Sequence, residues 1–284
     1  MALTLLLALG GVGTGAFGAL LGLGGGLLLV PFLTLGFGIP FREAVAVSLL
    51  AVIATSSASA AVYLERGTAN LRLGLTLEMF TAAGAVVGGL VAFALDERLL
   101  SAIFAVMLTY VAFTMARRGD GSEGATSISA AAMDSDVGDS PDLAPGGYVA
   151  SLAGPDYHVH RLPLGLGLSA FAGMISALLG VGGGIIKVPA MHLAMGVPLR
   201  VSTATSNLTI GVTASASAML YVLRDAVDPY VAAPVVVGVF VGATVASRLA
   251  PRVPLRVLRL LFVVVLAFVA LEMAARALGV ELLP

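Results

Sequence analysis

Residues 19–26 read Ala-Leu-Leu-Gly-Leu-Gly-Gly-Gly, and residues 177–184 repeat them as Ala-Leu-Leu-Gly-Val-Gly-Gly-Gly. In both copies a Val-Pro pair begins four residues after the last glycine. Without gaps, residues 18–63 share 22 identities in 46 positions with residues 176–221. The chain therefore carries one segment twice. In a membrane protein, such a duplication is typical of a transporter whose binding site lies where the two repeats meet.

The composition excludes most soluble classes of protein. Of 284 residues, 59% are hydrophobic and 11% are charged, whereas an average soluble domain has about 25% charged residues. We therefore expect an integral membrane protein. The sequence has no cysteine, which excludes disulfides and thiolate metal sites, and it shows neither a metal-ligand spacing nor a catalytic serine motif. We expect no catalysis, no metal, no cofactor and no nucleic-acid partner.

Apolar segments long enough to form membrane-spanning helices occur in two groups of four. The first group covers residues 3–36, 43–64, 73–95 and 99–116, and the second covers 163–195, 201–223, 230–249 and 255–277. A spanning helix needs about 20 apolar residues, and an isolated strand would leave its backbone unpaired in lipid. The sequence thus predicts an all-α fold with one membrane repeat at 1–116 and another at 162–284.

Residues 117–161 differ from both membrane repeats. They are acidic and rich in small residues, and they contain no Lys or Arg between Arg118 and Arg161. This composition is typical of a flexible tether. We expect an acidic linker between the repeats, with a regulatory contact as the alternative.

The arginines favour inverted repeats. If every apolar segment crosses the membrane once, each half crosses four times and the arginines divide seven against seven between the two faces. If the first segment of each half is a hairpin broken at its glycines, each half crosses three times and the division becomes ten against four. Only the second division gives the bias of the positive-inside rule. We predict inverted halves with a cytoplasmic linker and external termini; parallel halves are the alternative.

The glycine runs predict an anion site. Each run can be followed by a half-helix whose first N–H groups have no intrahelical partner and carry partial positive charge. Such a helix end binds anions without a charged side chain. Close helix packing by small residues is the alternative interpretation. The glycines assigned to the anion are Gly24, Gly25, Gly26, Gly182, Gly183 and Gly184.

Lys187 lies deep in an apolar segment, where the first copy has Leu29. A charge at that depth is costly and usually faces a cavity or a partner, so we predict that Lys187 is the charge partner of the anion. Snorkelling to the membrane surface is the alternative. The polar side chains expected to donate hydrogen bonds to the anion are Ser48, Thr203, Ser206 and Asn207, of which the last three share a helix face. Bonding back to their own helix is the alternative for each of them.

Three further residues are candidates for carrying a coupling proton, namely His192, Glu78 and Glu272. Both acids lie inside apolar segments, but each has an arginine within six residues along the chain. A position at the membrane surface is therefore the alternative for the acids, and a packed polar role is the alternative for the histidine.

With its doubled Gly-rich stretch, the following Val-Pro and its apolar segments, the chain resembles the TauE/SafE (TSUP) family of sulfite and sulfonate exporters. The resemblance covers both membrane repeats. It implies a multi-pass protein of the inner membrane that moves sulfite or an organosulfonate such as sulfoacetate. We expect an alternating-access transporter with a small anion and the lipid bilayer as partners, and a homodimer is left open. The alternatives are a passive anion channel, a permease for another organic anion, and a scaffold whose glycines only pack.

Overall fold

The computed structural model describes residues 2–21, 25–65, 69–117, 152, 157–249 and 255–277. This part of the chain is built from helices, which confirms the all-α fold class. Five of its helical stretches are long and apolar enough to cross a membrane: Leu71–Ala94, Glu97–Thr114, Leu162–Leu179, Val201–Leu223 and Pro229–Ala246. The expected linker and Gly24 lie largely or wholly outside the described residues.

Each half contains the same series of helices. The first half consists of α1 (Ala2–Leu21), α2 (Gly26–Phe37), α3 (Phe41–Glu65), α4 (Leu71–Ala94) and α5 (Glu97–Arg117). The second consists of α6 (Leu162–Leu179), α7 (Gly184–Pro189), α8 (Leu199–Leu223), α9 (Pro229–Leu249) and α10 (Leu255–Ala277), and a π-helical turn, Ala190–Ala194, extends α7. The starts of α2 to α5 and of α7 to α10 are each 158 residues apart. This is the offset of the sequence repeat.

The first apolar segment of each half folds back on itself at its glycine run. In the first half, a Cβ atom at Gly10 of α1 would overlap the ring of Phe32 on α2 at 1.8 Å. In the second half, a Cβ atom at Gly165 of α6 would lie 2.3 Å from the sulfur of Met195, which follows the π-helical turn. Both contacts require the shorter helix to run back along the longer one. The predicted break is therefore present in both copies.

The two halves meet through exchanged helices. α1 packs along α9 of the other half, and α6 packs along α4. Glycines allow both contacts: a Cβ atom at Gly15 would lie 2.4 Å from the carbonyl oxygen of Val239, and one at Gly173 would lie 1.9 Å from that of Thr81. The residues of one contact are 158 positions from those of the other. The two contacts are thus equivalent by the repeat.

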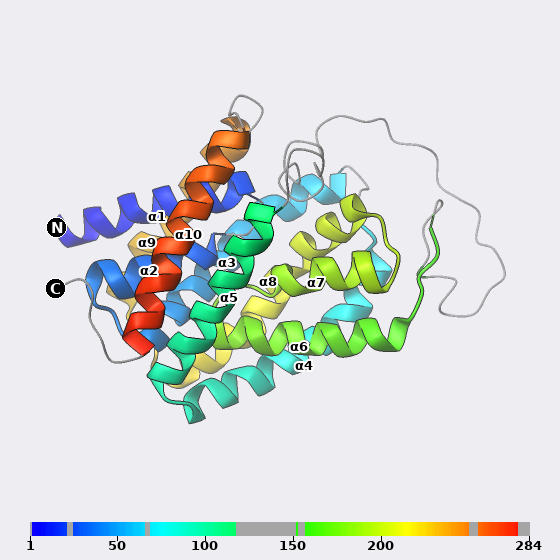
Figure 1. Cartoon of the computed structure of the whole chain (residues 1–284), viewed down its shortest axis with the longest axis horizontal. Coiled ribbons are helices and arrows are strands. Elements are labelled where there is room, and N and C mark those ends of the chain that lie inside the picture. The colour runs from blue at the N-terminus through cyan, green and yellow to red at the C-terminus, as the bar shows by residue number, and fades with distance from the viewer. Residues whose placement is uncertain are drawn as a thin grey trace.

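Figure 1 shows α1 beginning at one end of the long axis, beside the N-terminus, and α6 beginning at the opposite end. Inside the molecule α3 packs against α8, and at one side α5 packs against α10. The opposite directions of α1 and α6 are those expected of inverted halves. How the halves are oriented in a membrane stays a prediction.

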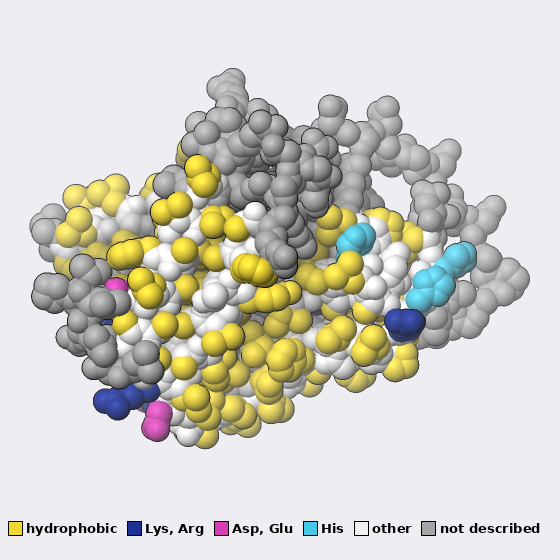
Figure 2. Space-filling view, in the orientation of Figure 1, with side chains coloured by type: hydrophobic (Ala, Val, Ile, Leu, Met, Phe, Trp, Pro, Cys, Tyr) yellow, Lys and Arg dark blue, Asp and Glu magenta, His cyan; other side chains and the backbone are white. Residues whose placement is uncertain are grey.

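The visible surface is dominated by hydrophobic side chains. In Figure 2 the few charged side chains on the visible face of the described residues lie toward the two ends of the long axis, and one histidine lies closer to the middle. Large apolar side chains such as Leu9, Val106 and Phe113 are more than half exposed. Exposed apolar surface on this scale marks contact with lipid or with a partner, which fits a chain surrounded by a bilayer.

Candidate functional site

Lys187 lies on α7, one turn after the glycine break, and only 1% of its surface is exposed. Its Nζ donates hydrogen bonds to Oε2 of Glu78 and, at 2.8 Å, to Oγ1 of Thr209. The other carboxylate oxygen of Glu78 accepts a hydrogen bond from Oγ1 of Thr213. We call these four residues the Lys187 cluster. It joins α4 of the first half to α7 and α8 of the second.

The packing of α4 against α8 positions Glu78 in this cluster. The two helices touch through residues spaced four apart on each, and this spacing keeps the contacts on one face of each helix. The contacts place Asn70 beside Thr205, Gly74 beside Thr205 and Thr209, and Glu78 beside Thr213. Because both series advance in the same direction, the helices run parallel here.

Asn70 fixes the start of α4. Its side-chain oxygen accepts a hydrogen bond from the backbone N–H of Leu73, at 3.0 Å, and so caps the helix. Its Nδ2 donates to the carbonyl oxygen of Leu152 and to the hydroxyl of Tyr157, each at 2.8 Å. Burial raises the pKa of the Tyr157 hydroxyl and outweighs the opposite effect of the hydrogen bond from Asn70. Tyr157 is therefore neutral at physiological pH.

The charges of the Lys187 cluster balance each other. Glu78 is 3% exposed and pairs with Lys187. Its side chain therefore lies inside the protein. The alternative position at the membrane surface, considered because Arg72 is close in the sequence, does not apply. An ammonium group has three N–H donors, and two of them have acceptors among the described residues. Lys187 can therefore accept a further ligand only by sharing or replacing its contact with Glu78, or through its third N–H.

The cluster has no equivalent in the other half. At the offset of 158, Lys187 corresponds to Leu29, Glu78 to Val236 and Thr209 to Ala51, while Thr213 corresponds to Thr55. Only the last pair keeps its hydroxyl. The charged residues of the cluster therefore have apolar counterparts in the other half.

The two glycine breaks approach each other at the centre of the fold. Ser48 on α3 places its Oγ 2.6 Å from the carbonyl oxygen of Gly180 and 3.2 Å from that of Gly26. Its single O–H is shared between the two carbonyls. Ser48, predicted to contact the anion, thus links the first break to the second.

Ser206 is the repeat counterpart of Ser48, but its surroundings differ. It is fully buried, and its Oγ has no hydrogen-bond partner in the described part of the chain. That oxygen lies 3.5 Å from the position that a Cβ atom of Gly184 would take. Ser176 of α6, beside Gly183, is also buried with an unpartnered hydroxyl. Since buried polar groups are normally hydrogen-bonded, two such hydroxyls at one break are available to a ligand.

Thr203 and Asn207 make other contacts on α8. Thr203 donates to the carbonyl oxygen of Leu199 on its own helix at 2.8 Å, the alternative considered for it. The backbone carbonyl of Asn207 accepts a hydrogen bond from Ser56 of α3 at 2.9 Å. Asn207 therefore lies at the contact of α3 with α8.

The other two candidates for proton coupling lie apart from Lys187. His192 is exposed, and its Nδ1 is 2.9 Å from the carbonyl oxygen of Val197 in the turn before α8. Glu272 is buried on α10, which packs against α5, and within the described ranges it forms no ion pair. Of the three candidates, only Glu78 is brought to Lys187.

Sequence reasoning did not select Thr209 and Thr213 for the site. Their spacing carried a usable signal, because Thr205, Thr209 and Thr213 follow one another at intervals of four on a helix and so share a face. The face chosen from the sequence, that of Thr203, Ser206 and Asn207, is a neighbouring one.

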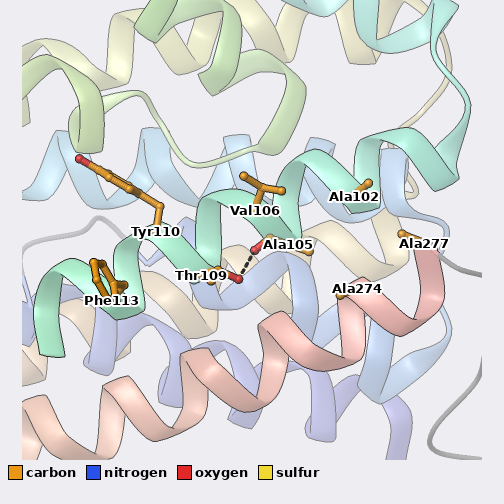
Figure 3. A pocket seen from close by; sticks show the side chains of 8 residues that line it. All are labelled: Ala102, Ala105, Val106, Thr109, Tyr110, Phe113, Ala274 and Ala277. Carbon is orange, nitrogen blue, oxygen red and sulfur yellow. Dashed lines mark hydrogen bonds between the residues drawn. The ribbon is translucent and has the colours of Figure 1, made fainter.

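A groove of about 580 Å³ lies between α5 and α10. Figure 3 shows the side chains that line it. Its lining residues are Ala102, Ala105, Val106, Thr109, Tyr110, Phe113, Ala274 and Ala277. The hydroxyl of Thr109 donates to the carbonyl oxygen of Ala105 at 2.8 Å and is thus satisfied within its own helix. The groove carries no charged side chain and does not suit an anion.

Two comparisons with known proteins agree with this architecture. The profile of the family described as "Sulfite exporter TauE/SafE" matches residues 7–273. YunE of Bacillus subtilis (strain 168), described as a probable membrane transporter protein, is 24% identical over 251 residues, which cover 84% of this chain and 85% of the relative. No solved structure matches the chain.

Proposed function

The chain belongs to the sulfite exporter TauE/SafE family and is a multi-pass membrane transporter, and from this premise we propose that it carries a small sulfur-containing anion across the cytoplasmic membrane. Sulfite and organosulfonates such as sulfoacetate are the proposed substrates. The protein would work as a secondary transporter by alternating access, through movement of one half against the other.

One observation supports this proposal above the others. At the second glycine break, Ser176 and Ser206 have buried hydroxyls without partners in the described residues, and they lie beside Gly183 and Gly184, which precede the buried Lys187 by one helical turn. A sulfonate or sulfite group offers three acceptor oxygens, which suits hydroxyl donors beside a positive charge. The partial positive charge at the start of a helix favours the same negative charge.

Ser206→Ala tests the assignment with little risk to the fold. The substitution removes a hydroxyl that has no partner in the described structure, so the melting temperature should stay the same or rise. Anion affinity should fall by about 10- to 100-fold, because a hydrogen bond to a charged group contributes about 1.5–3 kcal/mol. Purified protein in detergent would be titrated with sulfite, sulfoacetate, methanesulfonate, taurine, sulfate and acetate, with thermal stabilisation as the readout.

Ser169→Ala is the matched control, since Ser169 on α6 is also buried with an unpartnered hydroxyl but does not contact the break glycines. It should leave the affinity unchanged. Equal affinities in the wild type and Ser206→Ala would remove the hydroxyl from the site. Stabilisation by acetate but by no sulfur-containing anion would overturn the proposed substrate class. Currents too large for a carrier, without stimulation by counter-flow, would identify a channel.

A further inference from the structure

The Lys187 cluster is electrically neutral before any anion binds, because the Glu78 carboxylate already pairs with the ammonium group. Both side chains are buried, at 1% and 3% exposure. A monoanion added to this place would leave one uncompensated negative charge in the interior, which is costly in protein and in membrane. The cost disappears if the carboxylate takes up a proton as the anion arrives.

We propose that Glu78 is the proton carrier of this transporter, and that each monoanion bound at Lys187 enters together with one proton taken up by Glu78. The inference rests on the proposed function, and it identifies the coupling ion. The proton comes from water, and it converts the carboxylate to a neutral carboxylic acid. The ammonium group keeps its proton and exchanges its contact with Glu78 for the anion. Release of the anion reverses both steps.

The surroundings of Glu78 offer few other groups for this proton. Within the described residues, α6 has no titratable side chain, and α7 has only Lys187. α8 contributes Tyr221, whose hydroxyl donates to the carbonyl of Ala177, and Arg200 in its first turn. On α4 itself, Arg72 is exposed. Among α4, α6, α7 and α8, Glu78 therefore carries the only carboxyl side chain that could take up this proton.

The two threonines let the cluster keep its hydrogen bonds during the exchange. Thr213 donates to the carboxylate when it is charged, and its hydroxyl can rotate to accept from a protonated Glu78. Thr209 can remain the second acceptor of Lys187. Lys187 is held on a helix that starts at a glycine break and continues into a π-helical turn, so a small shift of α7 can turn it toward the anion.

The test uses methanesulfonate, whose charge does not change with pH, and full-length protein in liposomes. Uptake by the wild type should carry one proton per anion, which a pH-sensitive dye inside the liposomes detects. Uptake should not respond to an imposed membrane potential. In binding measurements, the affinity should fall as the pH rises, by up to about tenfold for each pH unit, because one proton is bound with each anion.

Glu78→Gln should bind methanesulfonate with an affinity that does not depend on pH, and its uptake should move no proton, because the amide imitates the protonated acid. Glu78→Asp retains an acid and should retain the proton movement, even if it is slower. Glu272→Gln is the matched control, since it removes another buried membrane carboxyl, and it should behave like the wild type. Melting temperatures would show that the variants are folded.

Different results would overturn different claims. Binding of methanesulfonate by the wild type without proton uptake would overturn the proton coupling alone. A Glu78→Gln variant that keeps the pH dependence of the wild type would show that the ion pair only stabilises the fold. If the wild type binds neither methanesulfonate nor any other sulfur-containing anion, the proposed function fails and the coupling fails with it.

Discussion

At the residue scale, glycines set how closely the helices of the two halves approach. A Cβ atom at Gly84 of α4 would lie 1.9 Å from the carbonyl oxygen of Ala170 on α6, and one at its repeat counterpart Gly242 would lie 2.1 Å from that of Val12 on α1. Both oxygens belong to the backbone, so they cannot move away by a change of side-chain rotamer. These glycines therefore serve mainly to let two helices pack closely, whereas the glycines at the breaks separate one helix from the next.

Gly84→Ala should destabilise the protein by about 1–3 kcal/mol, because the added methyl group overpacks the contact of α4 with α6. Thermal unfolding in detergent measures the change. The control is Gly167→Ala on α6, where a Cβ atom would have no neighbour within 4 Å. That variant should be neutral or slightly more stable, because alanine favours a helix over glycine by about 1 kcal/mol. Equal melting temperatures for the two variants would contradict the close contact.

At the element scale, the second glycine break determines where α7 begins. Gly183, the residue before α7, has a φ of 75°, in the left-handed region that glycine adopts easily and other residues do not. The N–H of Lys187 donates to the carbonyl oxygen of Gly183 at 3.1 Å. The conformation of one glycine thus fixes the first turn of the helix that carries the lysine.

Gly183→Ala should cost about 1–2 kcal/mol of stability through its positive φ and should also weaken methanesulfonate binding, because it shifts the first turn of α7. Gly38→Ala separates the two effects. Gly38 also has a positive φ, of 66°, but a Cβ atom there would meet nothing within 4 Å and lies away from the break. It should lose stability and keep its anion affinity. If both variants bind the anion as the wild type does, the break does not position the site.

At the scale of the whole molecule, the exchanged contacts tie the halves together: α1 packs on α9, and α6 packs on α4. The site residues follow the same exchange, with Glu78 from one half and Lys187 from the other. Movement of one half against the other would therefore act directly on the ion pair. This connection makes the orientation of the halves in the membrane important for the mechanism.

Labelling of single cysteines can determine that orientation, because the natural chain has none. Inverted halves with three crossings each predict that Thr4→Cys and Glu281→Cys react from outside the cell with a maleimide that does not cross membranes. Ser135→Cys, in the acidic linker, should react only after the membrane is opened. Reaction of all three from the same side would favour four crossings per half and parallel repeats.

Sequence alone was sufficient for the properties that depend on local composition. The apolar content predicted a membrane protein, and the 158-residue repeat predicted two matching series of helices; the helix starts of the two halves lie 158 residues apart. The breaks at the glycine runs were also predictable, because glycine's backbone freedom and a helix's need for regular dihedrals are local properties. The same local logic identified Lys187 as a residue that needs a partner.

The partner of Lys187 was decided only by the tertiary structure. Glu78 lies 109 residues away in the chain, and both it and Thr213 reach the lysine because α4 of one half packs against α8 of the other. The sequence also could not separate Ser48, which bonds to two carbonyls, from its counterpart Ser206, which has no described partner. Periodicity shows which residues share a face of a helix, but which faces meet depends on how all the helices pack together.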